Sequence, residues 1–319
     1  MKNFFIKLFV TLSVLLILSC KTQEKSIEHN PFTADQDLEI QVEDTIFLSG
    51  TLSFANNSVL AIMIAGSGPT DRNCNNETGL NTDAFRLLAD SLKLNGISSF
   101  RYDKRGIARS TPVHESQMVI GDLVNDVLKI VRFFEGHFDR IVLIGHSEGA
   151  LITKAAAHQT KEVDGIVLLC GISTTLDKII EDQLARYPRL LELAIVHLDE
   201  IRDNKALSEV HVMLRSLFRE SVVPYLKSAF DLDPIEEISK VKQDIMIVGG
   251  RCDVQVPPNH ADSLKAYSEH ATKFIYEDMG HCLKHIGDDC MLNAESYSNP
   301  EIPLHSQMTR DIVVFISNQ

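Results

Sequence analysis

A serine flanked by glycines occupies residues 145–149, which read Gly-His-Ser-Glu-Gly. The apolar stretch 140–145 has the character of a buried strand, and residues 147–159 have that of a helix. So tight a turn between strand and helix needs glycines on both sides, because side chains there would collide, and it presents the serine hydroxyl at the strand end. Ser147 is therefore the predicted nucleophile of an acyl-transfer reaction.

A serine hydroxyl becomes a nucleophile only when a neighbouring base accepts its proton. The predicted base is His281, which follows the last expected strand, residues 272–278. His285 is one competitor. His260 and His270 are two more, but they lie in or beside a helix, away from the carboxyl end of that strand.

A carboxylate must orient that imidazole and stabilise its protonated form. The predicted acid is Asp253, three residues beyond Gly250, where the strand 243–250 ends. Asp278 is the alternative, although it precedes His281 by only three residues on the same strand end. Ligand sites in open α/β sheets lie at the carboxyl ends of strands, and the chain order Ser, Asp, His suits such a sheet.

The tetrahedral intermediate of acyl transfer needs two backbone N–H donors for its oxyanion. One is the amide of Glu148, directly after the nucleophile. The other is expected from the glycine-rich loop 65–72, where we choose the amide of Ser67. The loop does not fit a phosphate-binding loop, because no Lys-Ser/Thr pair follows it and Gly66 and Gly68 lack a third glycine at the required spacing.

The sequence gives no reason to expect a metal or a cofactor. His281 and His285 have the spacing of a metal-binding pair on a helix, but no third ligand has suitable spacing. The chain also contains no Cys-x-x-Cys pair of the kind found in zinc ribbons and redox sites.

The pattern of apolar residues predicts strands that alternate with helices from residue 38 onward. The expected strands are 38–44, 45–55, 58–66, 97–103, 140–145, 165–170, 243–250 and 272–278, and the expected helices are 83–96, 118–136, 147–159, 258–269 and 304–317. The first two strands are expected to be antiparallel, and the alternation after them is typical of a mostly parallel sheet with helices on both faces. Residues 171–242 interrupt it with helical stretches at 175–187, 190–204 and 208–220, which we interpret as a cap between strands 6 and 7.

The N-terminus has the pattern of an export signal. Lys2 and Lys7 precede an apolar run at 8–18, which is about half as long as a bilayer-spanning helix. An uncleaved membrane anchor is the alternative. Residues 17–20, Ile-Leu-Ser-Cys, resemble the lipobox of bacterial lipoproteins, which implies a signal peptide over 1–19 and a lipid on Cys20.

We therefore expect an exported lipoprotein of a bacterial cell envelope, with a flexible tether over 20–37 and a folded domain over 38–319. Membrane contact is expected only through the N-terminal lipid. The chain carries 31 Lys and Arg against 44 Asp and Glu, a net charge of −13. A nucleic-acid partner is not expected, because binding phosphates needs a cationic surface. The expected partner is a small-molecule acyl ester or a short peptide.

Together these segments resemble the α/β-hydrolases, in particular bacterial serine hydrolases of the serine aminopeptidase-like and esterase group. The matching segments are 64–73, 100–110, 144–150, 249–257 and 279–281. The resemblance implies an eight-stranded, mostly parallel sheet and a triad of Ser147, Asp253 and His281. It also implies that the Asp-Lys-Arg-Gly turn at 103–106 borders the site, with Arg105 in a structural role. Two positions depart from the usual pattern of the group, namely Ala65, where histidine is common, and Ala108, where glycine is common.

Apart from Cys20, five cysteines remain, an odd number, so at least one is expected to stay free or to pair between chains. Cys252 and Cys282 flank two members of the implied triad. Because the resemblance places their loops side by side, a disulfide between them is conceivable. The preferred interpretation is that both are simply small residues that fit into tight loops. The pairing of Cys74, Cys170 and Cys290 is left open.

The favoured function is carboxylic ester hydrolysis through an acyl-enzyme, with the cap setting the selectivity for acyl chain and leaving group. A serine aminopeptidase is the first alternative. It would use carboxylates near the cap to bind a free α-amino group, and the candidates are Glu181, Asp182, Glu192, Asp199 and Glu200. A non-catalytic binding lipoprotein is the second alternative.

Overall fold

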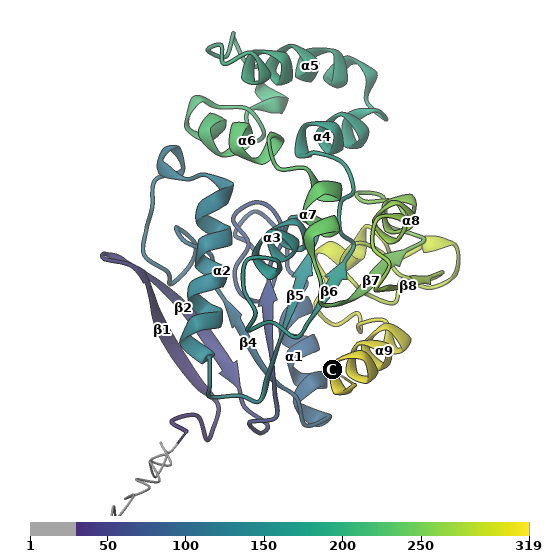
Figure 1. Cartoon of the computed structure of the whole chain (residues 1–319). Helices are drawn as coiled ribbons and strands as arrows, with labels where there is room; N and C mark the ends of the chain where they lie inside the picture. Colours follow the sequence, from purple (N-terminus) through teal and green to yellow (C-terminus); the bar gives the residue numbers. More distant parts are fainter. Residues whose placement is uncertain (1–29, 319) are drawn as a thin grey trace, which may run out of the picture. The chain divides into compact units, whose positions relative to one another are not determined.

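An eight-stranded β-sheet organises residues 30–318, the part of the chain that this computed structural model describes (Figure 1). Its strands are β1 (Gln36–Glu43), β2 (Ile46–Ser53), β3 (Val59–Ile64), β4 (Ser98–Tyr102), β5 (Arg140–His146), β6 (Gly165–Leu169), β7 (Asp244–Gly250) and β8 (Ala271–Tyr276). They lie in the order β1-β2-β4-β3-β5-β6-β7-β8. β2 pairs antiparallel with β1 and β4, and every other pair in this sheet is parallel. The expected α/β-hydrolase fold is confirmed.

Both faces of the central strands are buried, which explains why these strands are apolar throughout. In β3 the alternate residues Leu60, Ile62 and Ile64 belong to one core, and Val59, Ala61 and Met63 belong to the other. The first core contains residues of α2 (Ile120–Phe134), α3 (Glu148–Ala157) and α8 (Asn259–Ala266), and the second contains residues of α1 (Ala84–Leu94) and α9 (Ser306–Ser317). Helices therefore cover both faces, as expected.

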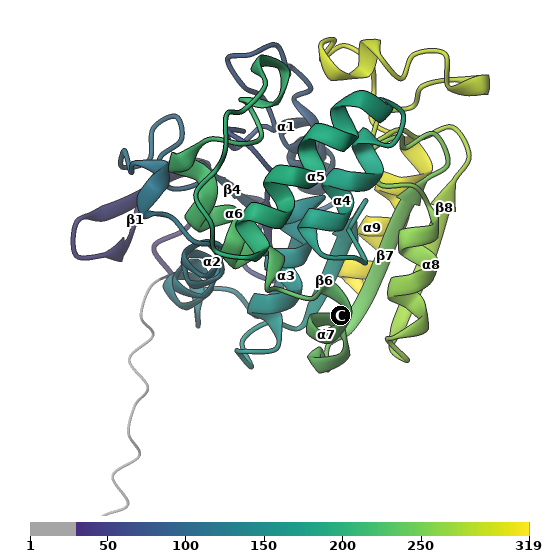
Figure 2. The ribbon, with the colours of Figure 1, turned by 90° about the horizontal axis from the view of Figure 1, so that it is seen from above.

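The insertion between β6 and β7 is helical. It contains α4 (Leu176–Leu184), α5 (Pro188–Arg202), α6 (Val223–Phe230) and α7 (Pro234–Lys240). Seen from the side and from above, α4, α5 and α6 lie beyond the carboxyl ends of the strands (Figures 1 and 2). They share a small core of their own, which includes Ala194, Leu198 and Phe218. Two hydrogen bonds tie α4 and the turn after it to the loop after β7: Arg186 donates to the carbonyl of Val254, and Gln183 to that of Gln255.

The helix expected over 208–220 is wrong. The segment forms only a short 3₁₀ turn at Val212–Leu214, and a second one follows at Glu220–Val222. Leu214 and Phe218 are buried, but Val212 and Met213 are about two-thirds exposed, so the apolar residues do not form one continuous stripe. The β-branched valines add little helix propensity that could compensate.

The signal peptide, the lipidated Cys20 and most of the tether over 20–37 lie outside the described residues. Within residues 30–318, the helices are too short or too polar to cross a bilayer.

Candidate active site

Ser147 lies on the sharp turn between β5 and α3. Its backbone has φ 56° and ψ −121°. Residues other than glycine rarely adopt such a positive φ, which costs about 1–3 kcal/mol. A Cβ atom on Gly145 would lie 2.3 Å from the carbonyl oxygen of Gly149, and one on Gly149 would lie 2.2 Å from the carbonyl oxygen of Ile64. Both glycines are therefore required, and the strained turn that they permit projects Ser147 at the strand end.

His281 and Asp253 form a buried hydrogen-bonded pair. The imidazole Nδ1 of His281 donates to Oδ2 of Asp253 at 2.7 Å, and both side chains are at most 6% exposed. Oδ1 of Asp253 accepts two backbone N–H bonds, from Gln255 and Val256, each at 2.8 Å. Burial alone would raise the pKa of Asp253, but His281 and these amides outweigh it and lower the pKa below its usual 3.8. The carboxylate thus fixes the ring with Nε2 left to act as the base.

Ser147 and His281 line one small cavity of about 90 Å³. Gly66 and Ser67, from the loop after β3, line the same cavity. A Cβ atom on Gly66 would lie 3.1 Å from Cβ of Ser147, so this loop passes directly against the serine. The structure therefore brings the expected nucleophile, the expected base and the expected oxyanion loop together.

The expected oxyanion loop is held by Lys104, a residue that the sequence did not single out. Its buried Nζ donates to the carbonyl oxygens of Gly66 and Gly68, the latter at 2.9 Å. With these carbonyls turned toward the lysine, the loop is fixed from behind, while its amides stay available. Burial lowers the pKa of Lys104, and the nearby carboxyl of Glu148 opposes that shift.

The backbone amide and the side chain of Glu148 have different surroundings. Its amide is the first of α3, so it has no acceptor within the helix. Its carboxyl is 4% exposed, and burial raises its pKa, while Lys104 and Tyr225 favour the charged form. Tyr225 belongs to α6, so a residue of the cap lies near the carboxyl of Glu148 and influences its charge.

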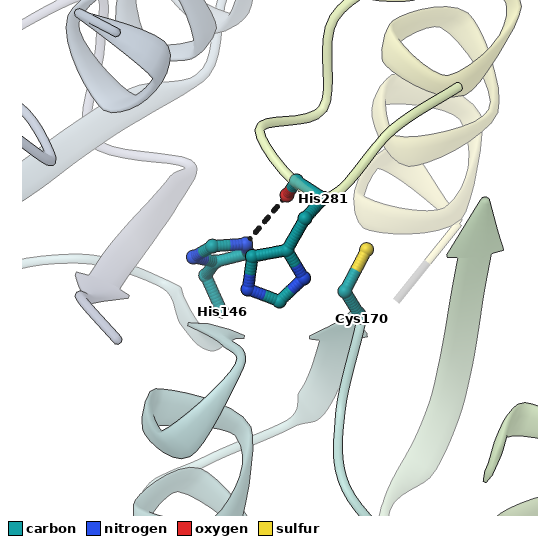
Figure 3. A group of neighbouring side chains, drawn as sticks. All are labelled: His146, Cys170 and His281. Atoms are coloured by element: carbon teal, nitrogen blue, oxygen red, sulfur yellow. Dashed lines mark hydrogen bonds between the residues drawn. The ribbon is translucent and has the colours of Figure 1, made fainter. Parts of the chain in front are cut away.

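Two further side chains lie around His281, as Figure 3 shows. Nε2 of His146 donates to the carbonyl oxygen of His281 at 2.9 Å. Burial and the neighbouring His281 lower the pKa of His146 to about 3, so His146 is neutral. Cys170, at the end of β6, lies on the other side of the ring, and burial and Asp253 raise the pKa of its thiol.

This trio of His146, Cys170 and His281 brings potential metal ligands within 4.8 Å of one another, but its chemistry does not suit a metal. The raised pKa of Cys170 favours the thiol, whereas metals bind the thiolate. The group is therefore better described as the surroundings of the base.

The comparisons with known proteins now decide the family. Residues 79–285, more than half of the chain, match the family model described as "Serine aminopeptidase, S33". The chain belongs to this family of α/β-hydrolases. It is thus a hydrolase by family, while no curated protein matches it closely enough to narrow the activity.

Solved structures of this fold include esterases and a peptidase. An esterase of Pyrococcus furiosus superposes with a TM-score of 0.60 at 16% identity, covering 89% of this chain and 91% of that one. Est1E from Butyrivibrio proteoclasticus, solved with ferulic acid, has a TM-score of 0.59 at 15% identity, covering 88% and 100%. The proline iminopeptidase of Mycobacterium smegmatis has a TM-score of 0.59 at 12% identity, covering 89% and 98%. At these identities the likeness shows the fold alone.

Three of the alternative candidates for the base and the acid in this S33-family chain interact with other residues. His260 contacts Ser173, with Nδ1 2.9 Å from the serine Oγ. Asp278 pairs with His285 at 2.7 Å and with Nε2 of His305 at 2.8 Å. His260, His270, His285 and Asp278 do not line the cavity at Ser147, as far as the described residues show.

The cluster of Asp278, His285 and His305 also places possible metal ligands close together. However, Nδ1 of His305 accepts the backbone N–H of Met308, so the proton of the neutral ring is on Nε2 and points at Asp278. His305 therefore has no free lone pair to offer a metal in this arrangement. It acts instead as the N-cap of α9.

A disulfide joins Cys252 to Cys290, with Cα atoms 5.5 Å apart. The pairing of Cys252 with Cys282 that the sequence left conceivable is therefore wrong, and the preferred interpretation of both as small loop residues is wrong for Cys252. Cys282 is free, as are Cys74 and Cys170 among the described cysteines. Cys290 lies in the loop before α9, which has no helical or strand periodicity, so its position next to the loop of Asp253 could not be inferred from spacing.

Arg105 has the structural role that the resemblance implied. Its guanidinium is 3% exposed and donates to both carboxylate oxygens of Asp126, at 2.6 and 2.8 Å, and to Glu43. It also lines a larger hollow of about 330 Å³, distinct from the cavity at Ser147. Because its donors are used in ion pairs, this hollow offers little to an anionic substrate.

Proposed function

We propose that this protein is a serine hydrolase that cleaves carboxylic esters through an acyl-enzyme. The observation that carries the proposal is the buried hydrogen bond between His281 and Asp253, next to the cavity that His281 shares with Ser147. A carboxylate, an imidazole and a serine in this order are the groups that acyl transfer requires.

In the proposed reaction, Oγ of Ser147 attacks the ester carbonyl carbon while its proton passes to Nε2 of His281. The amides of Glu148 and Ser67 bind the oxyanion of the tetrahedral intermediate. When that intermediate collapses, His281 returns the proton to the departing alcohol, which leaves the acyl group on Ser147. Water, deprotonated by His281, then attacks the acyl-enzyme and releases the acid. Asp253 stays ionised and stabilises the imidazolium in both steps.

Ester hydrolysis is preferred to aminopeptidase activity because of the ion pairs in the cap. Glu181 and Asp199 bind Arg202, at 2.6 and 2.9 Å, and Glu200 binds His197 at 3.0 Å. Three of the five carboxylates that would have served a free α-amino group are thus engaged within the cap itself. The structural likeness to a proline iminopeptidase keeps peptide cleavage as the second candidate.

We also propose that the protein is exported and lipid-anchored at Cys20. The disulfide between Cys252 and Cys290 supports export, because such bonds form and persist in oxidising compartments. Intact-mass analysis of membrane-extracted protein tests this, since acylation and cleavage before Cys20 change the mass of the chain. A water-soluble protein that retains residues 1–19 would contradict it.

A substrate panel tests the activity. Purified protein lacking residues 1–19 is assayed with p-nitrophenyl esters and with aminoacyl p-nitroanilides, beside the variants Ser147→Ala and Ser173→Ala. Ser173 is a matched control, because it is another buried serine in contact with a histidine. Ester turnover that is lost in Ser147→Ala and kept in Ser173→Ala supports the proposal. Turnover of anilides alone favours the peptidase, and no turnover favours a binding protein.

A further inference from the structure

The cavity at Ser147 is walled by segments outside the cap. Its lining residues come from the segment 66–84, from the loops after β5, β7 and β8, and from the segment before α9. Within the described chain, none of them lies in 171–242. The sequence led us to expect that the cap selects the acyl chain. The residues that surround Ser147 suggest instead that the loops lining this cavity select it.

The volume of this cavity limits what it can hold. At about 90 Å³ it is smaller than the cavity of about 150 Å³ that accommodates a benzene ring. An acetyl to butyryl group fits within this volume, whereas part of an aromatic acyl group or of a long alkyl chain would lie outside it.

Much of the wall is apolar or already hydrogen-bonded. Leu80, Ala84 and Cys282 contribute apolar surface. Two polar side chains of the wall have partners: Oγ1 of Thr82 donates to the carbonyl of Cys74, and Nε2 of Gln255 donates to the hydroxyl of Tyr297. No Asp, Glu, Lys or Arg of the described residues lines the cavity. A charged α-amino or carboxylate group would thus be buried here without a partner, which is unfavourable.

Tyr297 lines the cavity from a segment that is fixed at several points. Its carbonyl accepts the N–H of Asn81 at 2.8 Å, and its hydroxyl accepts from Gln255 at 2.8 Å. The disulfide at Cys290 and the buried Lys284, which donates to the carbonyl of Ile302 at 2.6 Å, hold the same segment on either side. Because both ends of the tyrosine are held, the wall is not free to retreat from a longer chain.

We propose that this cavity receives the acyl group and restricts the substrate to uncharged, short acyl chains of about two to four carbons. The inference rests on the proposed ester hydrolysis. The acyl side is assigned because the acyl group stays bound to Ser147 until water releases it, whereas the alcohol must leave first. A small recess with fixed walls beside Ser147 suits the half of the substrate that is retained. Leu80 and Tyr297 are then the residues that determine chain length.

The test is a chain-length series of p-nitrophenyl acetate, butyrate, hexanoate and octanoate. In the unaltered protein, kcat/KM is expected to fall at least roughly 10-fold from butyrate to hexanoate, since one methylene too many costs about 10- to 200-fold. Leu80→Ala should move the optimum to hexanoate, and Leu80→Phe should lower butyrate turnover more than acetate turnover. Leu193→Ala, an exposed change on α5 of the cap, is the control and should leave the profile unchanged.

Two results would overturn the inference and leave ester hydrolysis standing: a rate that rises toward octanoate in the unaltered protein, or a profile that changes with Leu193→Ala and not with either Leu80 variant. If Leu80→Ala fails to fold, the chain-length profiles of Leu80→Phe and of the unaltered protein still show whether this cavity limits the acyl chain. If no ester is turned over by protein that a fluorophosphonate labels at Ser147, the proposed ester hydrolysis itself fails, and the inference fails with it.

Discussion

The side chain of His146 holds the main chain of His281: its Nε2 donates to the carbonyl oxygen of His281 at 2.9 Å. The residue that directly precedes the nucleophile thereby positions the loop of the base. Because His146 is the last residue of β5 and His281 lies beyond β8, this contact connects the ends of two strands through residues that are 135 positions apart in the chain.

Replacing His146 with phenylalanine should lower kcat roughly 10- to 100-fold, because a displacement of the base by a fraction of an ångström weakens proton transfer. Glutamine keeps an N–H donor at a similar reach and should restore most of the activity. The rates of His146→Phe and His146→Gln on one ester, with melting temperatures for both, make the comparison. Equal loss in the two variants would show that the hydrogen bond is not the relevant property.

The same histidine should make the fold sensitive to acid. Its pKa is about 3 in the folded protein and 6.5 ordinarily, so between these values the unfolded chain binds more protons. The free energy of unfolding therefore rises with pH across this window and falls on acidification, by at most on the order of 1 kcal/mol per pH unit from this group. Urea unfolding at pH 7, 6, 5 and 4 should show a steeper loss in the unaltered protein than in His146→Gln. Parallel pH profiles would contradict the neutral state of His146.

Asp253→Asn should keep the fold and lose the activity. The carboxamide oxygen can still accept the N–H groups of Gln255 and Val256, but it cannot hold His281 in the correct tautomer or stabilise its charge. We expect kcat to fall roughly 10³- to 10⁴-fold with little change in KM. Asp278→Asn is the control, because that carboxylate pairs with His285 and His305 instead and should cost little activity.

Loss of the disulfide should affect both stability and catalysis. The double variant Cys252→Ser, Cys290→Ser is expected to be less stable by about 2–4 kcal/mol, mainly because its unfolded chain is less constrained. Activity should also fall, since Cys252 directly precedes Asp253 and Cys290 holds the segment of Tyr297. Dithiothreitol should lower the activity of the unaltered protein and leave that of the double variant unchanged. A reductant effect of equal size in both would exclude this disulfide as its cause.

The sequence predicted those features that depend on local pattern. All eight strands of the described sheet were expected within a few residues, because strands buried on both faces are continuous apolar runs. The residues Ser147, Asp253 and His281 were identified because each directly follows a strand at its carboxyl end. Contacts between distant loops had no such signal, so Lys104, His146 and Tyr297 were missed, and so was the partner of Cys252. Lys104 and His146 lie inside motifs already recognised, as the variable positions of Asp-x-Arg-Gly and Gly-x-Ser-x-Gly.

The nucleophilic character of Ser147 is tested most directly by fluorophosphonate labelling, with the adduct located by peptide mass mapping. The account predicts one adduct on the peptide that contains Ser147, loss of labelling in Ser147→Ala, and unchanged labelling in Ser173→Ala. Folded, unaltered protein that takes up no label, or that carries its label on another residue, would contradict it.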